Sequence, residues 1–488
     1  MDERQARDFL EIGVTELNKR ERDWQRHEDY YHGKQDLPYA PEGVNEEYLE
    51  LREMALANWL AIAMDAPIQR LRVDGFRTGR DSDADQRAWD DVWQANRMDA
   101  RQRIVYSQMM VHGRGVVSVW PNEKNRSQPL VRPENGKRIH AEPDPEDPFS
   151  PLFVVKRWTV RDARLGARGV FAAPRTRSVA VVHDGKTGDW FRFERGGNLF
   201  SGEWLVVDGD ASPLGEQPFV FYDHKQDADG IPHSALAPLM SAQDAINTIR
   251  FNTLLAMQFS AFRQRVFVGY DPVVRDERGM PVWQKDSTGA LILDSNGQPQ
   301  PVLNSPGRVG VDRALVFPGA DTKVFDLAES NLKNYIEVLG EFLSDFFAIA
   351  QVPPQYLLSR MVNLSGDALA GAESTLASLV SDLQTATGES HEELMRKANK
   401  ARGEDNPDIA SEVIWGDGEA RSFAQTVDAI TKLISQGFPR SAAFEMIPGA
   451  TQQKVRRWME LAGDEAVDPL IAGLLRPAPG ESGAPVGG

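Results

Sequence analysis

Three short stretches of this sequence hold residue types that could support nucleotide or metal chemistry, and each lacks one essential partner. Gly185-Lys186-Thr187 is similar to the end of a phosphate-binding loop, but that loop needs a glycine where Ala180 stands. His391-Glu392 begins a helical zinc motif, but Met395 occupies the position of the second histidine. Gly113-Arg114-Gly115 departs from a dinucleotide fingerprint at the third glycine. We therefore expect no catalytic residue, cofactor or metal site, and no enzyme.

A line of carboxylates runs along a predicted helix over residues 326–350. Glu337, Glu341 and Asp345 recur at steps of four, which places them on one side of a helix. Two apolar lines accompany them, formed by Tyr335, Leu339, Phe342, Phe346 and Ile349 and by Ile336, Leu343 and Phe347. A helix with two apolar lines has neighbours on two sides, as in a close-packed barrel of helices.

A proline pair must end this helix. Pro353 and Pro354 cannot continue it, because proline lacks the N–H group and its ring clashes with the preceding turn. Asn363 or Ser365 can then cap a second helix that runs to about residue 403. The sequence thus predicts a helix, a loop and a capped helix.

The composition bounds the class of protein. Among 488 residues, 72 are acidic and 55 basic, giving a formal charge of −17, which disfavours tight binding to nucleic acid phosphates. Cysteine is absent, which excludes disulfides and thiolate sites. The charged N-terminus is unlike a signal peptide, and no apolar run approaches the length of a membrane span. We expect a soluble, intracellular chain.

The remaining elements follow from hydrophobic period and turn residues. Helices are expected over residues 1–35, 46–71 (ended by Pro67), 84–113, 234–265, 422–436, 439–447 and 451–462. Strands are expected over residues 72–76, 116–120, 152–160, 179–183, 190–194, 204–208 and 219–222, with a hairpin turn after His183, and an irregular strand or linker over 404–416. Residues 121–150 are expected to form a long loop, 266–322 a β-rich insertion and the end of the chain from Ala466 a disordered tail.

This order of elements resembles the portal proteins of long-tailed (siphovirus-type), double-stranded DNA bacteriophages. The most specific stretches are Ile349–Leu358 (IAQVPPQYLL) and Asn363–Leu369 (NLSGDAL), which are similar to the family's junction between stem and wing. Tyr31-x-Gly33 and the turn into a strand at His112–Val119 are weaker matches. The resemblance extends over about residues 20–463.

The resemblance implies an α+β, helix-dominant portal fold. Its parts are a wing of N-terminal helices and a β-rich part (1–233), a first stem helix (234–265), a β-rich clip (266–322), a second stem helix (323–350), a tunnel loop (351–364), a long wing helix with a linker (365–419), a short helical crown (420–463) and a disordered tail (464–488).

The resemblance also implies a function. The family forms a ring of about twelve subunits at the unique capsid vertex of the virion, closed by cyclic symmetry. Double-stranded DNA is packaged through its channel by the terminase and is later ejected. The implied partners are further copies of the chain, the large terminase subunit, a head-completion or adaptor protein, the major capsid protein and the scaffold, with assembly in the host cytoplasm and no membrane.

Eight residues become candidate sites under this resemblance. Gln355, Arg360 and Asn363 lie in the implied tunnel loop as DNA contacts, although Arg360 fits an ion pair with an adjacent subunit equally well. Arg263 and Arg265 fit either a basic contact between stem and clip or a helix C-terminal charge.

The acidic line formed by Glu337, Glu341 and Asp345 has two interpretations. It could form stacked negative rings that line the channel, or it could be a solvated stripe. Two alternative functions remain beside the portal: a non-viral oligomeric scaffolding protein, and an intracellular hydrolase, for which the sequence shows no constellation of polar residues.

Overall fold

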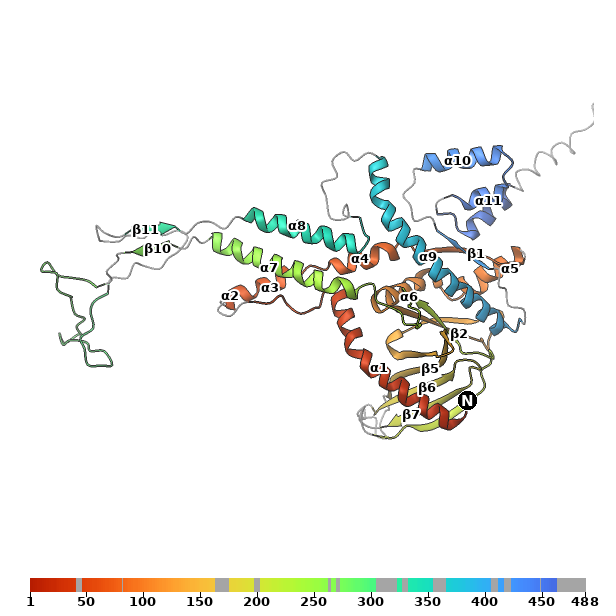
Figure 1. The fold of residues 1–488 in the computed structure, drawn as a ribbon, viewed down its shortest axis with the longest axis horizontal. Coiled ribbons are helices and arrows are strands. Elements are labelled where there is room, and N and C mark those ends of the chain that lie inside the picture. The colour runs from red at the N-terminus through yellow and green to blue at the C-terminus, as the bar shows by residue number, and fades with distance from the viewer. Residues whose placement is uncertain are drawn as a thin grey trace, which may run out of the picture. The chain divides into compact units, whose positions relative to one another are not determined.

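The computed structural model describes residues 1–40, 46–80, 82–162, 175–196, 202–261, 265–268, 273–303, 323–326, 332–353, 366–404, 411–416, 423–447 and 449–462. Helices and antiparallel strands follow one another along the chain, so the predicted α+β class is confirmed (Figure 1). The chain divides into two compact units. The first comprises Met1–Asp36, Ala57–Gln243 and Ser344–Gly488, and the second comprises Leu37–Leu56 and Asp244–Leu343.

A five-stranded antiparallel meander forms the larger sheet of the first unit. Its order is β4 (Ile139–Asp144), β5 (Asp147–Asp162), β6 (Arg175–Asp184), β7 (Trp190–Gly196) and β8 (Leu205–Asp210). The predicted hairpin after His183 is confirmed, since the Asp184 carboxylate accepts the N–H groups of Lys186 and Thr187, both at 3.0 Å. Gly188 closes this turn at φ +72°, a conformation that favours glycine.

Helix α1 (Glu3–Tyr31) covers this sheet (Figure 1). It begins at a capping box in which Asp2 and Gln5 satisfy each other's backbone N–H groups. Leu10 is buried against β5 to β7, and the ring of Phe9 stacks on Phe153 at 4.3 Å. A Cβ at Gly13 would lie 2.4 Å from Val155 Cγ2, so only glycine allows this close approach.

A three-stranded sheet forms the second layer of the first unit. Its order is β3 (Leu130–Glu134), β2 (Arg114–Trp120) and β9 (Phe219–Asp223), and it contacts α6 (Met98–His112) and α9 (Gly366–Arg402). α5 (Ser82–Arg87) and the π-helix η1 (Ala88–Gln94) precede α6. Trp89, Trp93 and Met98, on η1 and α6, are buried in the core. The strand β1 (Val73–Arg77) pairs with β12 (Glu412–Trp415), which settles the irregular region near residue 413 as a strand.

The core of the first unit surrounds His391 of α9. Its imidazole is 1% exposed and lies between two phenols, with Nε2 at 2.7 Å from Tyr106 Oη and Nδ1 at 2.9 Å from Tyr222 Oη. The Tyr106 hydroxyl donates onward to Gln102 Oε1, so Nε2–H donates to Tyr106 and Nδ1 accepts from Tyr222. Burial lowers the pKa of His391 to about 3, because the site disfavours an imidazolium.

The single helix predicted over residues 46–71 is wrong, because three helices occupy this range. They are α2 (Glu46–Leu49), α3 (Leu51–Ala55) and α4 (Trp59–Ile68). The break has a capping cause: the Asn58 side chain accepts the N–H of Ala61 at 3.1 Å and donates to Tyr31 O at 2.8 Å. Pro67 lies inside α4 rather than ending it, one residue before its last position.

The long loop predicted over residues 121–150 is also wrong. This range contains β3, the short 3-10 helix η2 (Gly136–Arg138) and β4. Val131 and Ile139 are buried, and Asn96 anchors β3 by accepting the N–H of Val131 at 2.9 Å. Pairing of β3 with β2 and of β4 with β5 therefore forms strands from a stretch whose composition favours a loop.

The two long helices that flank the insertion are confirmed, with shorter bounds. A 3-10 turn, η3 (Ala237–Leu239), leads into α7 (Met240–Ala261), and α8 covers Leu332–Ile349. The predicted helical residues 323–326 are instead β11 (Lys323–Asp326), and Arg265, predicted as a helix end, begins β10 (Arg265–Val268). β10 and β11 pair antiparallel, and this pairing replaces the helical turns.

Residues 273–303 of the second unit form what we call the three-turn module. Three Asp-x-x-Gly turns, at Asp276, Asp286 and Asp294, each place a glycine at positive φ. The backbone N–H of Val282 donates to Val274 O, that of Val302 to Val282 O and that of Val274 to Val302 O, a closed ring of hydrogen bonds of 2.7 to 2.9 Å. Gln284, Ile292 and Gln300 form a second such ring. The predicted β-rich character of the insertion is confirmed for these residues.

The helices after β12 agree with prediction. They are α10 (Phe423–Ser435), α11 (Arg440–Glu445) and a further helix over residues 452–462. The predicted tail, from residue 464, lies outside the described residues.

The buried state of His391 predicts an acid-sensitive core. The unfolded chain takes up a proton below pH 6.5 and the folded core does not until about pH 3, so stability falls as pH drops through this window. One such group contributes about 1.4 kcal/mol per pH unit. We expect His391→Gln to lower the urea midpoint at pH 7, since it leaves a tyrosine hydroxyl unpaired, but to reduce the loss between pH 7 and pH 5. His32→Gln, which changes a histidine outside the core, is the control. A variant that keeps the full loss on acidification would contradict this assignment.

Candidate functional site

The acidic line predicted on α8 is present and points outward from its own chain. Glu337, Glu341 and Asp345 are all exposed. An ion pair on this line joins Lys333 Nζ to Glu337 Oε1 at 3.6 Å, between two well exposed side chains. An exposed pair of this kind contributes little to stability. The line is therefore available to a solvent-filled channel or to bulk solvent.

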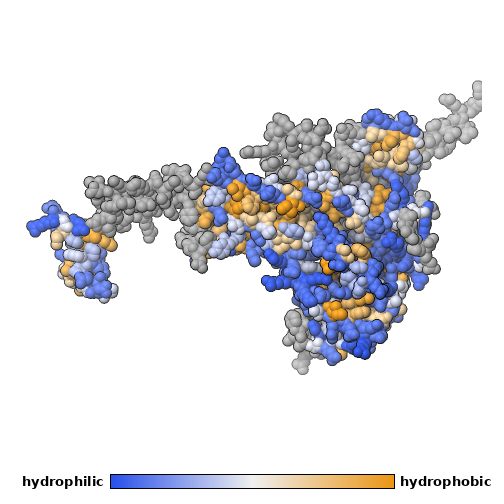
Figure 2. Space-filling model, viewed as in Figure 1, coloured by the Kyte–Doolittle hydropathy of each residue, from blue (hydrophilic) through white to orange (hydrophobic). Residues whose placement is uncertain are grey.

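The apolar lines of α8 are buried only near its C-terminal end. Phe346 and Phe347 are buried, and Phe347 meets the ring of Trp59 edge-on at 6.0 Å. Within the second unit, the helices α7 and α8 expose large apolar side chains, as the orange surface in Figure 2 shows. These are Met257, Ile336, Val338 and Phe342, which are 50%, 64%, 47% and 39% exposed. Exposed apolar residues that recur along a helix mark a surface for contact with another protein.

The C-terminal end of α8 has a defined geometry. Val352 N–H donates to Phe347 O at 3.1 Å and Gln351 N–H donates to Ala348 O at 3.2 Å, the paired bonds of a Schellman motif. Gln351 has φ +57°, in a position where glycine is usual. The apolar contact of this motif comes from Val352 and Phe347, both buried. Packing therefore fixes the point at which the chain leaves α8.

Only part of the predicted site can be located. Gln355, Arg360, Asn363 and Arg263 lie outside the described residues. Arg265 is in β10, in register with Asp326 of β11. The acidic line is the one predicted set whose three members the structure describes together.

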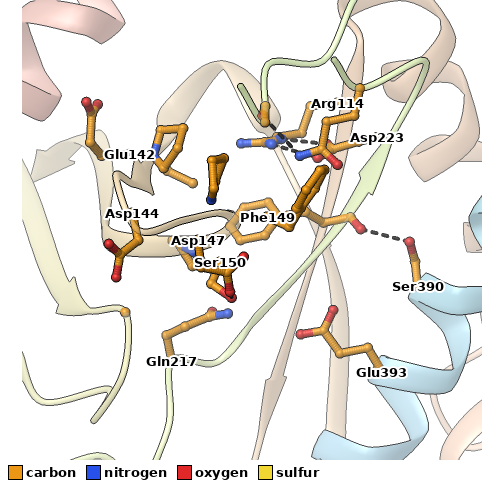
Figure 3. A pocket seen from close by; sticks show the side chains of 18 of the residues that line it. Arg114, Glu142, Asp144, Asp147, Phe149, Ser150, Gln217, Asp223, Ser390 and Glu393 are labelled. Atoms are coloured by element: carbon orange, nitrogen blue, oxygen red, sulfur yellow. Dashed lines mark hydrogen bonds and ion pairs between the residues drawn. The ribbon is translucent and has the colours of Figure 1, made fainter. Parts of the chain in front are cut away.

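A large cleft in the first unit was not predicted from sequence. Its volume is about 1080 Å³, and it lies between the β4–β5 turn, the start of β9 and helix α9 (Figure 3). Carboxylates dominate its lining, with Glu142, Asp144, Glu146, Asp147, Glu216, Asp223, Glu389 and Glu393 outnumbering Arg114, Lys186, Lys225 and Lys397. These residues come from segments far apart in sequence, and each segment alone resembles an ordinary polar loop or helix face.

Ion pairs neutralise part of this lining. Arg114 makes two bonds of 2.6 Å to the Asp223 carboxylate, and Lys186 Nζ lies 3.0 Å from Asp144 (Figure 3 shows the first pair). The N–H of Glu146 and then Lys186 lower the pKa of Asp144. In contrast, the side chains of Glu146 and Glu389 are exposed and make no ion pair with any other described residue. The cleft thus keeps a surplus of negative charge.

The motifs set aside in the sequence have structural roles. Gly185-Lys186-Thr187 belongs to the β6–β7 turn, and His391 belongs to the core. No group of three or more histidine or carboxylate side chains among the described residues is arranged to hold a metal ion. In the same part of the chain, none of the helices has the length and apolar character to cross a membrane.

Comparison with known proteins gives one consistent result. The family model described as phage portal protein, SPP1 Gp6-like, matches residues 15–467. The portal protein of Mycobacterium phage D29 is 26% identical over 424 residues, which is 83% of this chain and 79% of that protein. The portal protein of Mycobacterium phage L5 is 25% identical over 444 residues, which is 87% of this chain and 83% of that protein.

A solved structure is also similar, at a lower level. A chain from the neck of an empty GTA particle covers 82% of this chain and 96% of its own length, with 11% identity and a TM-score of 0.41. A score of this size adds nothing to the match of the family model.

Proposed function

The chain belongs to the phage portal protein family, and from this premise we propose that it forms the ring at the unique capsid vertex through which double-stranded DNA is packaged and later ejected. The observation that carries this proposal is the family match, which extends over residues 15–467. We propose a structural role in the virion rather than a catalytic one. The same ring would dock the terminase during packaging and the head-completion proteins afterwards.

The described elements support an assignment of the portal parts. We assign the stem to α7 and α8, the clip to residues 266–322, the tunnel loop to 351–364 and the long wing helix to α9. The wing would further comprise residues 1–233, and the crown the helices over 420–463. The outer face of the wing would meet the major capsid protein and the scaffold.

The exposed apolar side chains of the stem support assembly into a ring. A single chain leaves Ile336, Val338 and Phe342 substantially in water. In a closed ring each subunit offers this surface to a neighbour, and burial of apolar area is worth about 25 cal/mol per Å². A monomeric hydrolase would have no use for this exposed line, whereas a non-viral oligomeric scaffolding protein could also bury it and differs from a portal in forming no closed ring with a central hole.

We assign the acidic line to the channel wall. Glu337, Glu341 and Asp345 in about twelve copies would form stacked negative rings. Such rings repel the phosphate backbone and let DNA slide without being held, over a range of about 8–10 Å at physiological salt. Arg360 of the tunnel loop, with Gln355 and Asn363 as neutral neighbours, would supply the weak attractive contacts.

Ring assembly is the first test. We expect the purified chain to form rings with a central hole in negative-stain images, with a mass of about twelve subunits. Ile336→Asp with Val338→Asp should leave the helical content unchanged, since both side chains are exposed in the single chain, and should abolish the rings. Leu205→Asp with Val207→Asp, which changes two exposed apolar residues of β8, is the matched control. Rings that form equally well from the double variant would remove α8 from the subunit interface.

The acidic line predicts a packaging defect on charge reversal. Glu337→Lys with Glu341→Lys would convert two negative rings into positive ones that hold the phosphate backbone. We expect assembled rings to package DNA at a rate reduced by at least about tenfold, with partial recovery as salt is raised. The control is Glu11→Lys with Glu277→Lys, the same charge change at exposed sites on α1 and the three-turn module. Equal packaging by both double variants would identify the line as a solvated stripe.

Arg360 predicts a smaller effect of the opposite kind. We expect Arg360→Ala rings to assemble normally and to retain packaged DNA less well, because one weak cationic contact per subunit is lost. The measurement is the fraction of packaged DNA that becomes nuclease-sensitive after the motor stops. If assembly itself fails while Arg360→Lys restores it, Arg360 pairs with a neighbouring subunit instead.

A further inference from the structure

The wall of the cleft in the first unit carries a glutamine amide whose orientation is fixed. Gln217 is 5% exposed, and its Oε1 accepts the N–H of Phe219 at 2.6 Å. That bond fixes the orientation of the amide, because a backbone N–H needs the oxygen rather than the nitrogen. Nε2 makes no hydrogen bond with any described residue. Figure 3 shows the amide end directed into the cleft, between the Asp147–Ser150 stretch and α9.

The backbone around Gln217 is held rigidly, so this donor has a fixed direction. Lys397 Nζ donates to Gln217 O at 2.8 Å and to Phe219 O at 2.9 Å. Lys397 is 2% exposed and also pairs with Glu393 at 3.3 Å. Burial lowers the pKa of Lys397, and the two carbonyls and the carboxylate compensate for that burial. An N–H₂ group held in a fixed direction at the cleft wall can donate to an acceptor such as a carbonyl oxygen.

Two further features surround this donor. The carboxylates of Glu146 and Glu389 line the cleft and form no direct ion pair with another described residue, so they can receive lysine or arginine side chains. The ring of Phe149, 66% exposed, lies at the same cleft and offers an aromatic face to a cation or an apolar side chain (Figure 3).

We propose that this cleft binds an extended, lysine- and arginine-rich peptide segment of a different protein. The Gln217 amide would donate to a backbone carbonyl of the segment, Glu146 and Glu389 would pair with its basic side chains, and Phe149 would cover it. The cleft volume of about 1080 Å³ leaves room for several residues of an extended peptide. The surplus of carboxylates disfavours nucleic acid.

The charge of the chain favours a different protein over a second copy. The whole chain carries a formal charge of −17, so a second copy approaching this acidic cleft meets net repulsion. A basic segment of another protein meets attraction. This inference does not depend on the ring, because every group it uses belongs to the first unit of a single chain.

The test uses a fluorescein-labelled peptide of alternating lysine and arginine with a central tryptophan, titrated against the full chain at physiological salt. Fluorescence anisotropy gives its Kd, and the same peptide with glutamate at each basic position should not bind. We expect Glu146→Gln with Glu389→Gln to weaken binding by about three- to tenfold, as for two exposed ion pairs. Glu11→Gln with Glu277→Gln removes the same charge elsewhere and should have little effect.

Two variants distinguish specific recognition of the peptide in the cleft from nonspecific electrostatic attraction. Gln217→Glu keeps the acceptor for Phe219 N–H but removes the donor and adds negative charge. Recognition of a carbonyl predicts binding weaker by about threefold or more, whereas charge alone predicts tighter binding. Phe149→Ala, at an exposed position, should also weaken binding. Thermal melting checks that each variant folds.

Two results together would contradict the proposed site. Folded Gln217→Glu would bind the peptide as tightly as the unchanged chain or more tightly, and the cleft and control double variants would weaken binding equally. Comparing unassembled subunits with purified rings tests the occupant. A peptide that binds both supports the proposal, and one that binds only unassembled subunits would show that a neighbouring copy fills the cleft. If the chain forms no rings but binds the peptide as expected, the proposed ring is contradicted and the proposed peptide site is not.

Discussion

The core packing of the first unit depends on one buried imidazole whose two nitrogens are both hydrogen-bonded. His391 lies among Phe76, Trp93 and Trp415, and two phenols hold its two nitrogens. A neutral ring donates to one phenol and accepts from the other, so no buried polar atom of this group is left unpaired. Because these partners belong to β1, η1, α6, β9 and β12, the bond pair fixes α9 against elements from across the unit. The same residue that resembles half of a zinc motif in the sequence is therefore a structural centre.

This centre and the end of α8 together constrain the segment between them. α9 is held by His391 and Lys397, and α8 ends in a Schellman motif whose apolar contact is buried. Both anchors belong to the first unit. The chain between Pro353 and Gly366 must therefore leave and re-enter fixed points, which is what a loop needs if identical copies are to present it at equal positions in a ring.

The sequence predicted the features that depend on local period. The long helices, the six strands from 116 to 222 and the stop at Pro353 follow from spacing and turn residues within one segment. The strands β3, β4 and β11 were missed because their pairing partners, not their composition, make them strands. The Asp-x-x-Gly repeat at 276, 286 and 294 was present in the sequence as a signal of the three-turn module and was not recognised. The cleft had no such signal, since Phe149, Gln217 and Glu389 meet only in the folded chain.

The carboxylates on α8 and those in the cleft differ in what surrounds them, and we therefore propose different roles for them. On α8 the three carboxylates stand exposed along one line of a helix, an arrangement suited to repelling a phosphate backbone. In the cleft, carboxylates surround the Gln217 amide donor and the ring of Phe149. The carboxylates can attract a cationic ligand, and the amide can donate a hydrogen bond to it in one direction. Net charge alone, −17, cannot distinguish these cases. What distinguishes them is whether a polar group of known orientation lies within reach, because long-range charge steers a partner while a directed hydrogen bond selects it.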